Sequence, residues 1–406
     1  MRVLELFAGA GGAYLGLRAA GLKCAAAVEW DAWAAATLRA AGAPAFHGDV
    51  RDLASIEAIV GPLGVRLLWS SFPCQAWSSA GKRLGARDER NGWPWTVDAI
   101  DRFRPVGVLC ENVVGLSHHK AGCIGRDGQE GLFGSVDPMT CPGCYLHRVI
   151  LPDLRARFAH AGFFVLDAAD FGVPQHRRRL ILWAGPSLLA RPVATHGPDA
   201  GKGAPGWVSM RTALGLGEAG HLLYPCGTTS KTAGGPTPDA EPAPAVTGRG
   251  NQYLVPMRTG RHEDGRPALP VGDDPAPPVL ASYGEGQPWT RAGHPWVADG
   301  VVMSDGPGSR PELLERPSPT VSAVGECKGS GPGGHPEKMQ RASDALYLAT
   351  GRRRLTWQEC AVLQDFPTGH PFAGPADAKY RQIGNAVPPR LAEVVGRAAL
   401  AAWGER

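Results

Sequence analysis

The sequence predicts an α/β fold in which a domain built on a largely parallel sheet is joined to a second, smaller and loop-rich domain. Short apolar runs alternate with helical patterns from residue 1 to about 185, which is typical of parallel strands with crossover helices. Much of the excess of glycine and proline, 55 and 37 residues, lies between about 185 and 340. At 406 residues the chain is also longer than one typical domain.

These changes in pattern divide the chain into three parts. Residues 1–185 form the core domain, with an insertion at 116–148. Residues 186–345 form the irregular second domain; its apolar pieces, such as QYLVPM, need burial, and they argue against the alternative of a disordered linker. Helical order returns in 346–406, which we expect to complete the core domain.

Composition limits the classes of function. The formal net charge of +4 permits an anionic partner such as nucleic acid without requiring one. No stretch approaches the roughly 18 apolar residues of a membrane span, and the first residues do not resemble a signal peptide. We therefore expect a cytoplasmic protein without a membrane partner, whose nine cysteines serve thiol chemistry or metal binding rather than disulfides.

The first strand is predicted at 2–7, and a glycine-rich turn, AGAGG at 8–12, separates it from a helix that ends at Gly21. Such a turn allows a ligand to approach the backbone closely. The dinucleotide fingerprint G-x-G-x-x-G is absent because Tyr14 stands where glycine or alanine is required. This departure disfavours the alternative of a nicotinamide dehydrogenase.

The next two strands each end in an acidic residue. Strand 24–30 ends in Glu29 and Trp30, and the short run 45–50, after a helix at 31–42, leaves Asp49 at another strand end. A carboxylate at the end of the second strand can accept hydrogen bonds from ribose hydroxyls. For Glu29 the alternative is a solvated loop residue. The pattern predicts a cofactor that contains a ribose and an adenine.

A thiol and a carboxylate follow the next two strands. The apolar run from Val65 ends in FPCQ at 72–75, so that Cys74 is expected on the loop beyond the strand. The strand predicted at 106–110 is followed by Glu111. Ligands of open α/β sheets bind at this edge, which places both side chains in one crevice. The alternative for Cys74 is a buried thiol that acts as a small apolar side chain.

The last parts of the core domain are basic and then helical. RRRLIL at 177–182 alternates as a strand on which Arg177 and Arg179 share a face, with Arg178 in solvent. Near the C-terminus, Thr356 and Glu359 have the spacing of a capping box. A Gly384-Asn385 turn precedes a helix opened by Pro388 and Pro389.

Taken in order, these motifs resemble the DNA cytosine-C5 methyltransferases of the bacterial or phage type, which often accompany restriction enzymes. The matching pieces are FAGAGG (7–12), Glu29-Trp30, Gly48-Asp49-Val50, Pro73-Cys74-Gln75, Glu111-Asn112-Val113, Gln175-x-Arg177-x-Arg179, LTWQECAVLQDFP and Gly384-Asn385-Ala386-Val387-Pro388. The resemblance covers about 1–185 and 350–400. It implies a Rossmann-like methyltransferase domain and, in 186–345, a target-recognition domain.

The resemblance also implies the ligands and the roles of individual residues. It implies S-adenosyl-L-methionine as cofactor and double-stranded DNA as partner, and we expect a monomer. Cys74 would be the nucleophile, Glu111 would contact a flipped cytosine, and Arg177 would support it. The residues implied to bind the cofactor are Phe7, Ala8, Gly9, Gly11, Gly12, Glu29, Trp30, Asp49, Val50, Pro73, Asn385, Ala386 and Val387.

Two alternatives stay open within this resemblance. A tRNA cytosine-C5 methyltransferase would share most of the pattern, although that branch usually lacks so large a recognition segment. A catalytically silent, sequence-specific DNA-binding protein would share the fold, and the intact Cys74, Glu111 and Asn385 argue against it.

The insertion at 116–148 departs from the family pattern. It contains Cys123, a Cys-Pro-Gly-Cys knuckle at Cys141 and Cys144, and several histidines, of which His147 is nearest to the knuckle. Three cysteines and one histidine make a common structural zinc set, and we expect Cys123, Cys141, Cys144 and one of the nearby histidines, His118, His119 or His147, to bind zinc, with His147 as the first choice. The alternative is three unligated cysteines in a glycine-rich loop.

Overall fold

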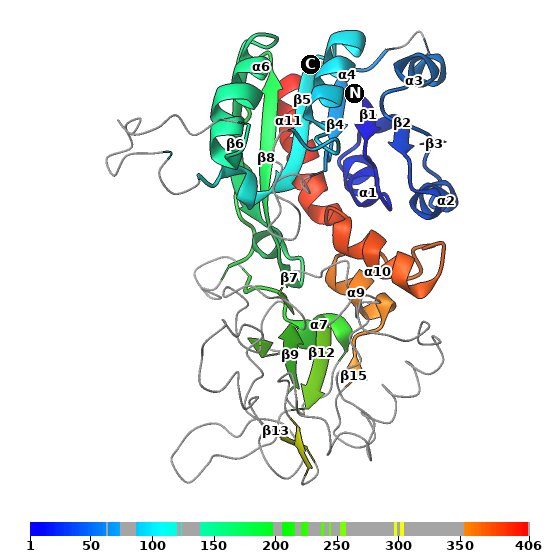
Figure 1. Ribbon diagram of the computed structural model, residues 1–406, viewed down its shortest axis with the longest axis vertical. Coiled ribbons are helices and arrows are strands. Elements are labelled where there is room, and N and C mark those ends of the chain that lie inside the picture. Colours follow the sequence, from blue (N-terminus) through cyan, green and yellow to red (C-terminus); the bar gives the residue numbers. More distant parts are fainter. Residues whose placement is uncertain are drawn as a thin grey trace.

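The structure is a computed structural model that describes two well-defined stretches and several short strands between them. The described residues are 1–61, 64–73, 87–119, 123, 139–197, 205–215, 221–225, 237–238, 243–244, 252–256, 296–298, 301–303 and 353–404. Figure 1 shows an upper lobe with a large sheet and a lower lobe with a small one. Within the described residues no helix is long and apolar enough to cross a membrane.

The upper lobe is built on a seven-stranded sheet in the order β3-β2-β1-β4-β5-β8-β6. Neighbouring strands among the first five run parallel, whereas β8 is antiparallel to both β5 and β6. The strands are β1 (Arg2–Leu6), β2 (Lys23–Glu29), β3 (Ala45–His47), β4 (Leu67–Ser70), β5 (Gly107–Val113), β6 (His160–Asp167) and β8 (Arg178–Gly185). This arrangement confirms the predicted α/β fold class.

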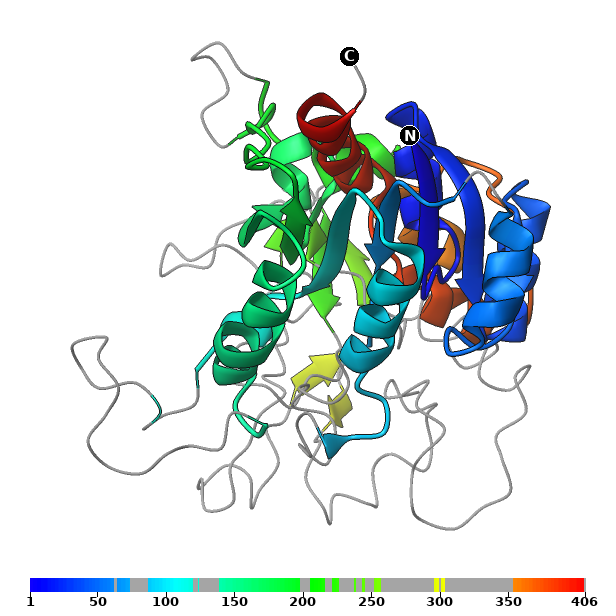
Figure 2. The ribbon, with the colours of Figure 1, turned by 90° about the horizontal axis from the view of Figure 1, so that it is seen from above.

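Helices cover both faces of this sheet, as the view from above shows (Figure 2). On one face α3, α4 and the segment from α5 to α6 pack against the strands, and on the other face α1 and α11 do so. The helices of this lobe are α1 (Gly12–Ala19), α2 (Ala32–Ala40), α3 (Leu53–Val60), α4 (Trp93–Phe103), η2 (Val114–Ser117), α5 (Pro142–Tyr145), η3 (Leu146–Ile150), α6 (Leu151–Arg155), η4 (Ala168–Phe171) and α11 (Pro389–Trp403).

The chain at the start of α11 packs closely against α1, because Gly12 and Gly16 of α1 have no side chains. A Cβ at Gly12 would lie 2.0 Å from the Val387 carbonyl oxygen, and one at Gly16 would lie 2.0 Å from that of Pro389. Any larger residue would therefore force α11 away from α1. The close contact brings residues 386–389 against the glycine-rich turn that follows β1.

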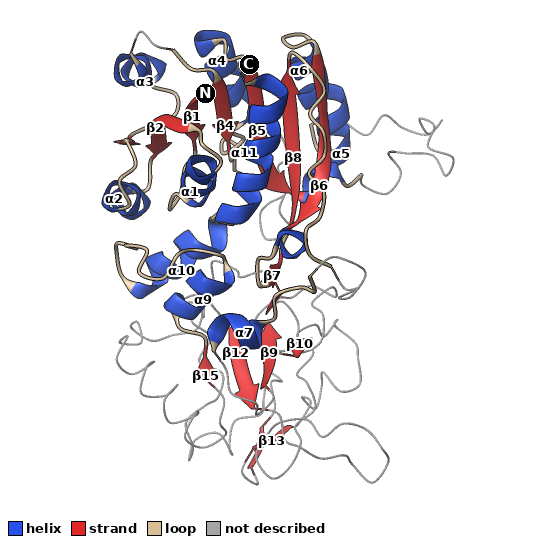
Figure 3. Ribbon diagram, turned by 180° about the vertical axis from the view of Figure 1, so that it is seen from behind, coloured by secondary structure: helices blue, strands red, loops and turns tan. Residues whose placement is uncertain are grey.

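The lower lobe contains the small sheet β10-β9-β12-β15, with α7, α9 and α10 between the two lobes (Figure 3). Its elements are β7 (Gln175–His176), α7 (Met210–Leu214), β9 (His221–Pro225), β10 (Thr237–Pro238), β11 (Ala243–Pro244), β12 (Gln252–Pro256), β13 (Trp296–Ala298), β14 (Val301–Met303), β15 (Arg353–Arg354), α9 (Trp357–Leu363) and α10 (Ala376–Asn385). Much of the expected recognition domain lies outside the described residues.

Most expected elements lie within a few residues of their predicted bounds, and the capping box of Thr356 and Glu359 is present at α9. Two predictions were wrong. The strand expected to end before Glu111 continues to Val113, because β8 pairs with it along its whole length. Gly384 and Asn385 are the last residues of α10 rather than a free turn, and the chain becomes extended at Ala386.

Candidate active site and candidate metal centre

The glycine-rich turn after β1 is held by Glu29. One carboxylate oxygen of Glu29 accepts a hydrogen bond from Gly9 N at 2.7 Å, and the other accepts one from Asp31 N at 2.7 Å. Burial raises the pKa of this carboxyl group, against the lowering effect of those backbone bonds. Glu29 thus fixes the turn at the edge where β1 and β2 end.

Aromatic side chains border the same edge. Phe7 has a left-handed backbone with φ of 56°, which is strained for a residue with a side chain, and its ring stacks on Trp95 at 6.3 Å. Trp30 is 76% exposed. Asp49 is ion-paired with Arg51, and this pairing lowers the pKa of its carboxyl group. The expected cofactor residues of the N-terminal half therefore gather at one edge of the sheet.

Cys74 lies outside the described residues, whereas Phe72 and Pro73, directly before it, are described. The side-chain amide of Asn112 donates to the Phe72 carbonyl oxygen at 3.0 Å, and Asn112 is buried. This bond joins the end of β5 to the chain that leads to Cys74. The sequence places Asn112 in the Glu111-Asn112-Val113 motif but predicts no role for it, because an amide beside an acidic residue carries no signal of its own.

The carboxylate of Glu111 is paired with an arginine on the neighbouring strand. Arg179 Nε lies 2.8 Å from Glu111 Oε1, and both side chains are largely buried. Arg179 is opposite Val113 in the antiparallel ladder, so that it sits diagonally across from Glu111 on the same face. The sequence placed Arg177 and Arg179 on one face and favoured Arg177; the structure brings Arg179 to Glu111.

Arg177 instead fastens the C-terminal segment to the core. It is 2% exposed, and its Nη2 donates to the carbonyl oxygens of Gly384 at 2.8 Å and Ala386 at 2.9 Å. The Gln364 side chain also donates to Ala386 O, at 2.6 Å. These bonds hold the chain from Asn385 to Val387 beside the glycine-rich turn.

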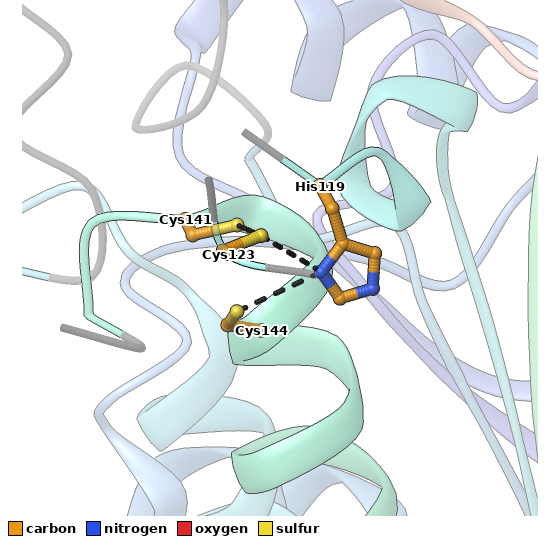
Figure 4. Close-up of side chains that lie close together, drawn as sticks. All are labelled: His119, Cys123, Cys141 and Cys144. Atoms are coloured by element: carbon orange, nitrogen blue, oxygen red, sulfur yellow. Dashed lines mark hydrogen bonds between the residues drawn. The ribbon is translucent and has the colours of Figure 1, made fainter. Parts of the chain in front are cut away.

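A second cluster of reactive side chains lies in the insertion. His119, Cys123, Cys141 and Cys144 each offer one ligand atom, and all four atoms lie within 4.8 Å of one another. His119 Nδ1 is 3.2 Å from Cys123 Sγ and 3.6 Å from Cys144 Sγ, and the sulfurs of Cys123 and Cys141 are 3.4 Å apart. Figure 4 shows the four side chains pointing toward a common centre.

The structure corrects one member of the expected metal set. His147 contributes no ligand atom to the cluster, because the chain after Cys144 continues as helix and carries its ring behind that of His119. The two imidazoles stack at 5.5 Å, and His147 meets Phe163 on its other side. His119, which follows η2, offers the fourth ligand atom in place of His147. The sequence could not show this, because it depends on how the chain turns after β5.

A protein-family model described as "C-5 cytosine-specific DNA methylase" matches residues 1–187 and 314–401. Among curated proteins, Type II methyltransferase M.Eco47II of Escherichia coli is 29% identical over 398 residues, which is 97% of this chain and 78% of that protein. M.PspPI of Psychrobacter sp. is 28% identical over 98% of this chain and 78% of its own length. M.NaeI of Lentzea aerocolonigenes is 37% identical over 45% of this chain and 40% of its own.

Solved structures share the fold at low sequence identity. The S. pombe Dnmt2 methyltransferase matches with a TM-score of 0.51 and 15% identity, covering 99% of this chain and 98% of its own. The Entamoeba histolytica methyltransferase EhMeth matches with a TM-score of 0.53 and 11% identity over the same shares of the two chains. At these identities the likeness concerns the fold alone.

Proposed function

The chain belongs to the C-5 cytosine-specific DNA methylase family, and from this premise we propose that it methylates a cytosine flipped out of double-stranded DNA, through a covalent adduct between Cys74 and C6 of the base. One observation carries the proposal furthest. The Asn112 bond to Phe72 O fixes the chain that leads to Cys74 beside the buried pair of Glu111 and Arg179. A thiol and a paired carboxylate then face the same base.

The family depends on S-adenosylmethionine, and the edge formed by β1, β2 and residues 386–387 suits this cofactor. Glu29 would accept hydrogen bonds from the ribose hydroxyls, and the exposed Trp30 offers an apolar face for the adenine. When bound, the cofactor supplies an electrophilic methyl group. Gly9, with φ of 56°, leaves room for it, because a Cβ there would enter open space, whereas Gly11 and Gly12 make room for Leu38 and Val387.

The residues suit the chemistry of the base. C5 of cytosine is a weak nucleophile, and addition of a thiolate at C6 makes it enamine-like and able to take the methyl group. A protonated Glu111 would donate its proton at N3 as the thiolate adds, and Arg179, 2.8 Å from Oε1, would orient the carboxyl group and stabilise the carboxylate that is left. Flipping costs roughly a few kcal/mol of stacking and pairing, which phosphate contacts from basic residues can offset.

A fluorinated substrate tests this mechanism. After methyl transfer the C5 hydrogen must leave before the enzyme is released, and fluorine at C5 blocks this step. The protein should therefore become covalently fixed to fluorinated target DNA only when S-adenosylmethionine is present. Cys74→Ser should abolish the adduct, since an alkoxide forms far less readily than a thiolate. Glu111→Gln should slow methylation by about a hundred-fold and leave DNA binding in place.

Methylation by the Cys74→Ser protein would contradict the covalent route. So would a wild-type protein that methylates DNA but never forms the adduct on a verified target. Adduct formation on tRNA in place of DNA would assign the same chemistry to a different nucleic acid.

We also propose that His119, Cys123, Cys141 and Cys144 hold one zinc ion. A tetrahedral ion with Zn–S of about 2.3 Å and Zn–N of about 2.0 Å requires ligand atoms about 3.5 to 3.8 Å apart. The observed separations of 3.2 to 3.6 Å are close to this. Protein purified without chelator should contain one zinc per chain; His119→Ala should lose it and His147→Ala should keep it. Metal-free wild-type protein, or the reverse ranking of the two variants, would contradict this site.

A further inference from the structure

We infer that the zinc-bound knuckle positions the chain on both sides of the catalytic pair, Cys74 and Glu111, so that loss of the metal slows methyl transfer far more than it weakens cofactor binding. The inference rests on the zinc site and on the methyl transfer proposed above. It assigns a positioning role to Tyr145, Asn91 and Gly92, none of which contacts the reacting atoms.

The first connection runs from the knuckle to the segment before α4. Tyr145 follows Cys144 directly, is 2% exposed, and its hydroxyl accepts a hydrogen bond from the buried Asn91 side-chain amide at 2.9 Å. About two helical turns further, Asp153 accepts a bond from Trp93 Nε1 at 2.8 Å. The segment from α5 to α6 is therefore hydrogen-bonded to the chain before α4 at Asn91 and Trp93.

The second connection runs from that segment to the residues before Cys74. A Cβ at Gly92 would lie 2.8 Å from Pro73 Cδ and 2.9 Å from Phe72 Cβ, so the backbone of Gly92 lies directly against both residues. The ring of Trp93 packs on that of Phe72 at 5.7 Å. A shift of Asn91 and Gly92 would therefore move Pro73, and with it the start of the segment that carries Cys74.

The third connection reaches Glu111. The ligand His119 follows η2, the short helix that continues β5 beyond Glu111 and Val113. Gly143 N donates to the His118 carbonyl oxygen at 3.0 Å, and a Cβ at Gly143 would lie 2.7 Å from the His119 ring. These contacts tie the turn after β5 to the knuckle, and a metal held by His119 and the cysteines would join the two directly.

Phe7 and Pro73 of the cofactor edge lie against Gly92, because a Cβ there would lie 3.0 Å from Phe7 Cζ and 2.8 Å from Pro73 Cδ. The rest of that edge is held elsewhere. Glu29, Gly9 and the chain at 384–386 are held by β2, by the first turn and by Arg177, on strands and helices away from α5. Loss of the metal should thus separate two properties that a general loss of the fold would change together. This separation is what distinguishes a positioning role from a contribution to stability alone.

Three variants test the inference, each measured in the full chain. Cys144→Ser should contain no zinc, form the adduct with fluorinated DNA at least about tenfold more slowly, as expected for a misplaced nucleophile, and bind S-adenosylmethionine within twofold of the wild type. Tyr145→Phe should keep its zinc and its cofactor affinity yet form the adduct several-fold more slowly. His147→Ala, which removes a stacked ring but no ligand, is the matched control and should behave as wild type.

Amide hydrogen exchange gives a readout independent of activity. Metal removal from the wild type by chelator should speed exchange at 87–93 and 113–118 and leave the glycine-rich turn unchanged, and added zinc should reverse the effect. The chelated wild type also serves if Cys144→Ser fails to fold. Equal adduct rates with and without zinc, in a wild type that does form the adduct, would overturn the inference. A wild type that never forms the adduct would instead refute the proposed chemistry, and unchanged exchange would independently refute the positioning role.

Discussion

At the residue scale, the most unusual group is Glu5 in the middle of β1. It is 1% exposed, and burial raises the pKa of its carboxyl group to about 8; the Tyr14 backbone opposes this effect, and the charge of Glu29 adds to it. In the unfolded chain a glutamate titrates near pH 4.5. Between these two values the folded protein therefore holds a proton that the unfolded chain has released.

This difference predicts how stability depends on pH. The contribution of Glu5 is fully present below about pH 4.5, falls by about 1.4 kcal/mol per pH unit as the pH rises, and stops changing above about pH 8. Glu5→Gln, which keeps the shape without the titration, should flatten this decline in urea unfolding at pH 5, 6.5 and 8. The exposed Glu89 serves as control, and Glu89→Gln should keep the wild-type slope. If the stability of Glu5→Gln declines with pH as steeply as that of the wild type, Glu5 is not the source of the decline.

At the element scale, Arg177, which lies between β7 and β8, joins this part of the chain to the end of α10. Arg177 bonds two carbonyl oxygens that are more than two hundred residues away in the sequence. Lysine would replace it poorly, because its ammonium group is more strongly hydrated than a guanidinium and is carried on a flexible stem. The bonds also hold Asn385 to Val387 where the cofactor is expected.

We therefore predict that Arg177→Lys lowers the free energy of unfolding by about 1 to 3 kcal/mol and weakens S-adenosylmethionine binding. Arg178, the exposed neighbour, offers a matched control, and Arg178→Lys should change stability by less than about 0.5 kcal/mol. Chemical denaturation and a cofactor titration measure the two effects. If Arg177→Lys and Arg178→Lys have the same stability and the same cofactor affinity, the two Arg177 hydrogen bonds contribute neither to the fold nor to the cofactor site.

At the scale of the whole molecule, the family model matches residues 1–187 and 314–401 and leaves out 188–313. The first matched part contains the strands of the large sheet, and the second contains the C-terminal helices that pack against that lobe. We propose that this middle region selects the DNA sequence. Base-edge contacts specify a site, whereas phosphate contacts only position the protein. Replacing roughly 190–340 with the matching region of a type II relative should then transfer the target preference without changing the chemistry. Sequencing of methylated DNA from an expressing host measures this, and an active chimera that keeps the original target would place recognition elsewhere.

The fold class and the family follow from the sequence because their signals are local. Alternating apolar runs, the turn after β1, the acid at the end of β2 and the capping box at Thr356 each depend on a few neighbouring residues, whose backbone preferences act within one turn or one strand. The structure contains each of these features close to its predicted position. The order of the motifs supplied the chemistry expected of Cys74 and Glu111.

Tertiary structure alone decided which of several similar residues does each task. Arg179 rather than Arg177 meets Glu111 because β8 pairs antiparallel with β5, and His119 rather than His147 joins the cysteines because η2 turns back onto α5. The bonds of Asn112 to Phe72 and of Asn91 to Tyr145 likewise join separate elements. Such contacts depend on strand order and helix packing, which bring together residues far apart in the chain, and no local preference encodes them.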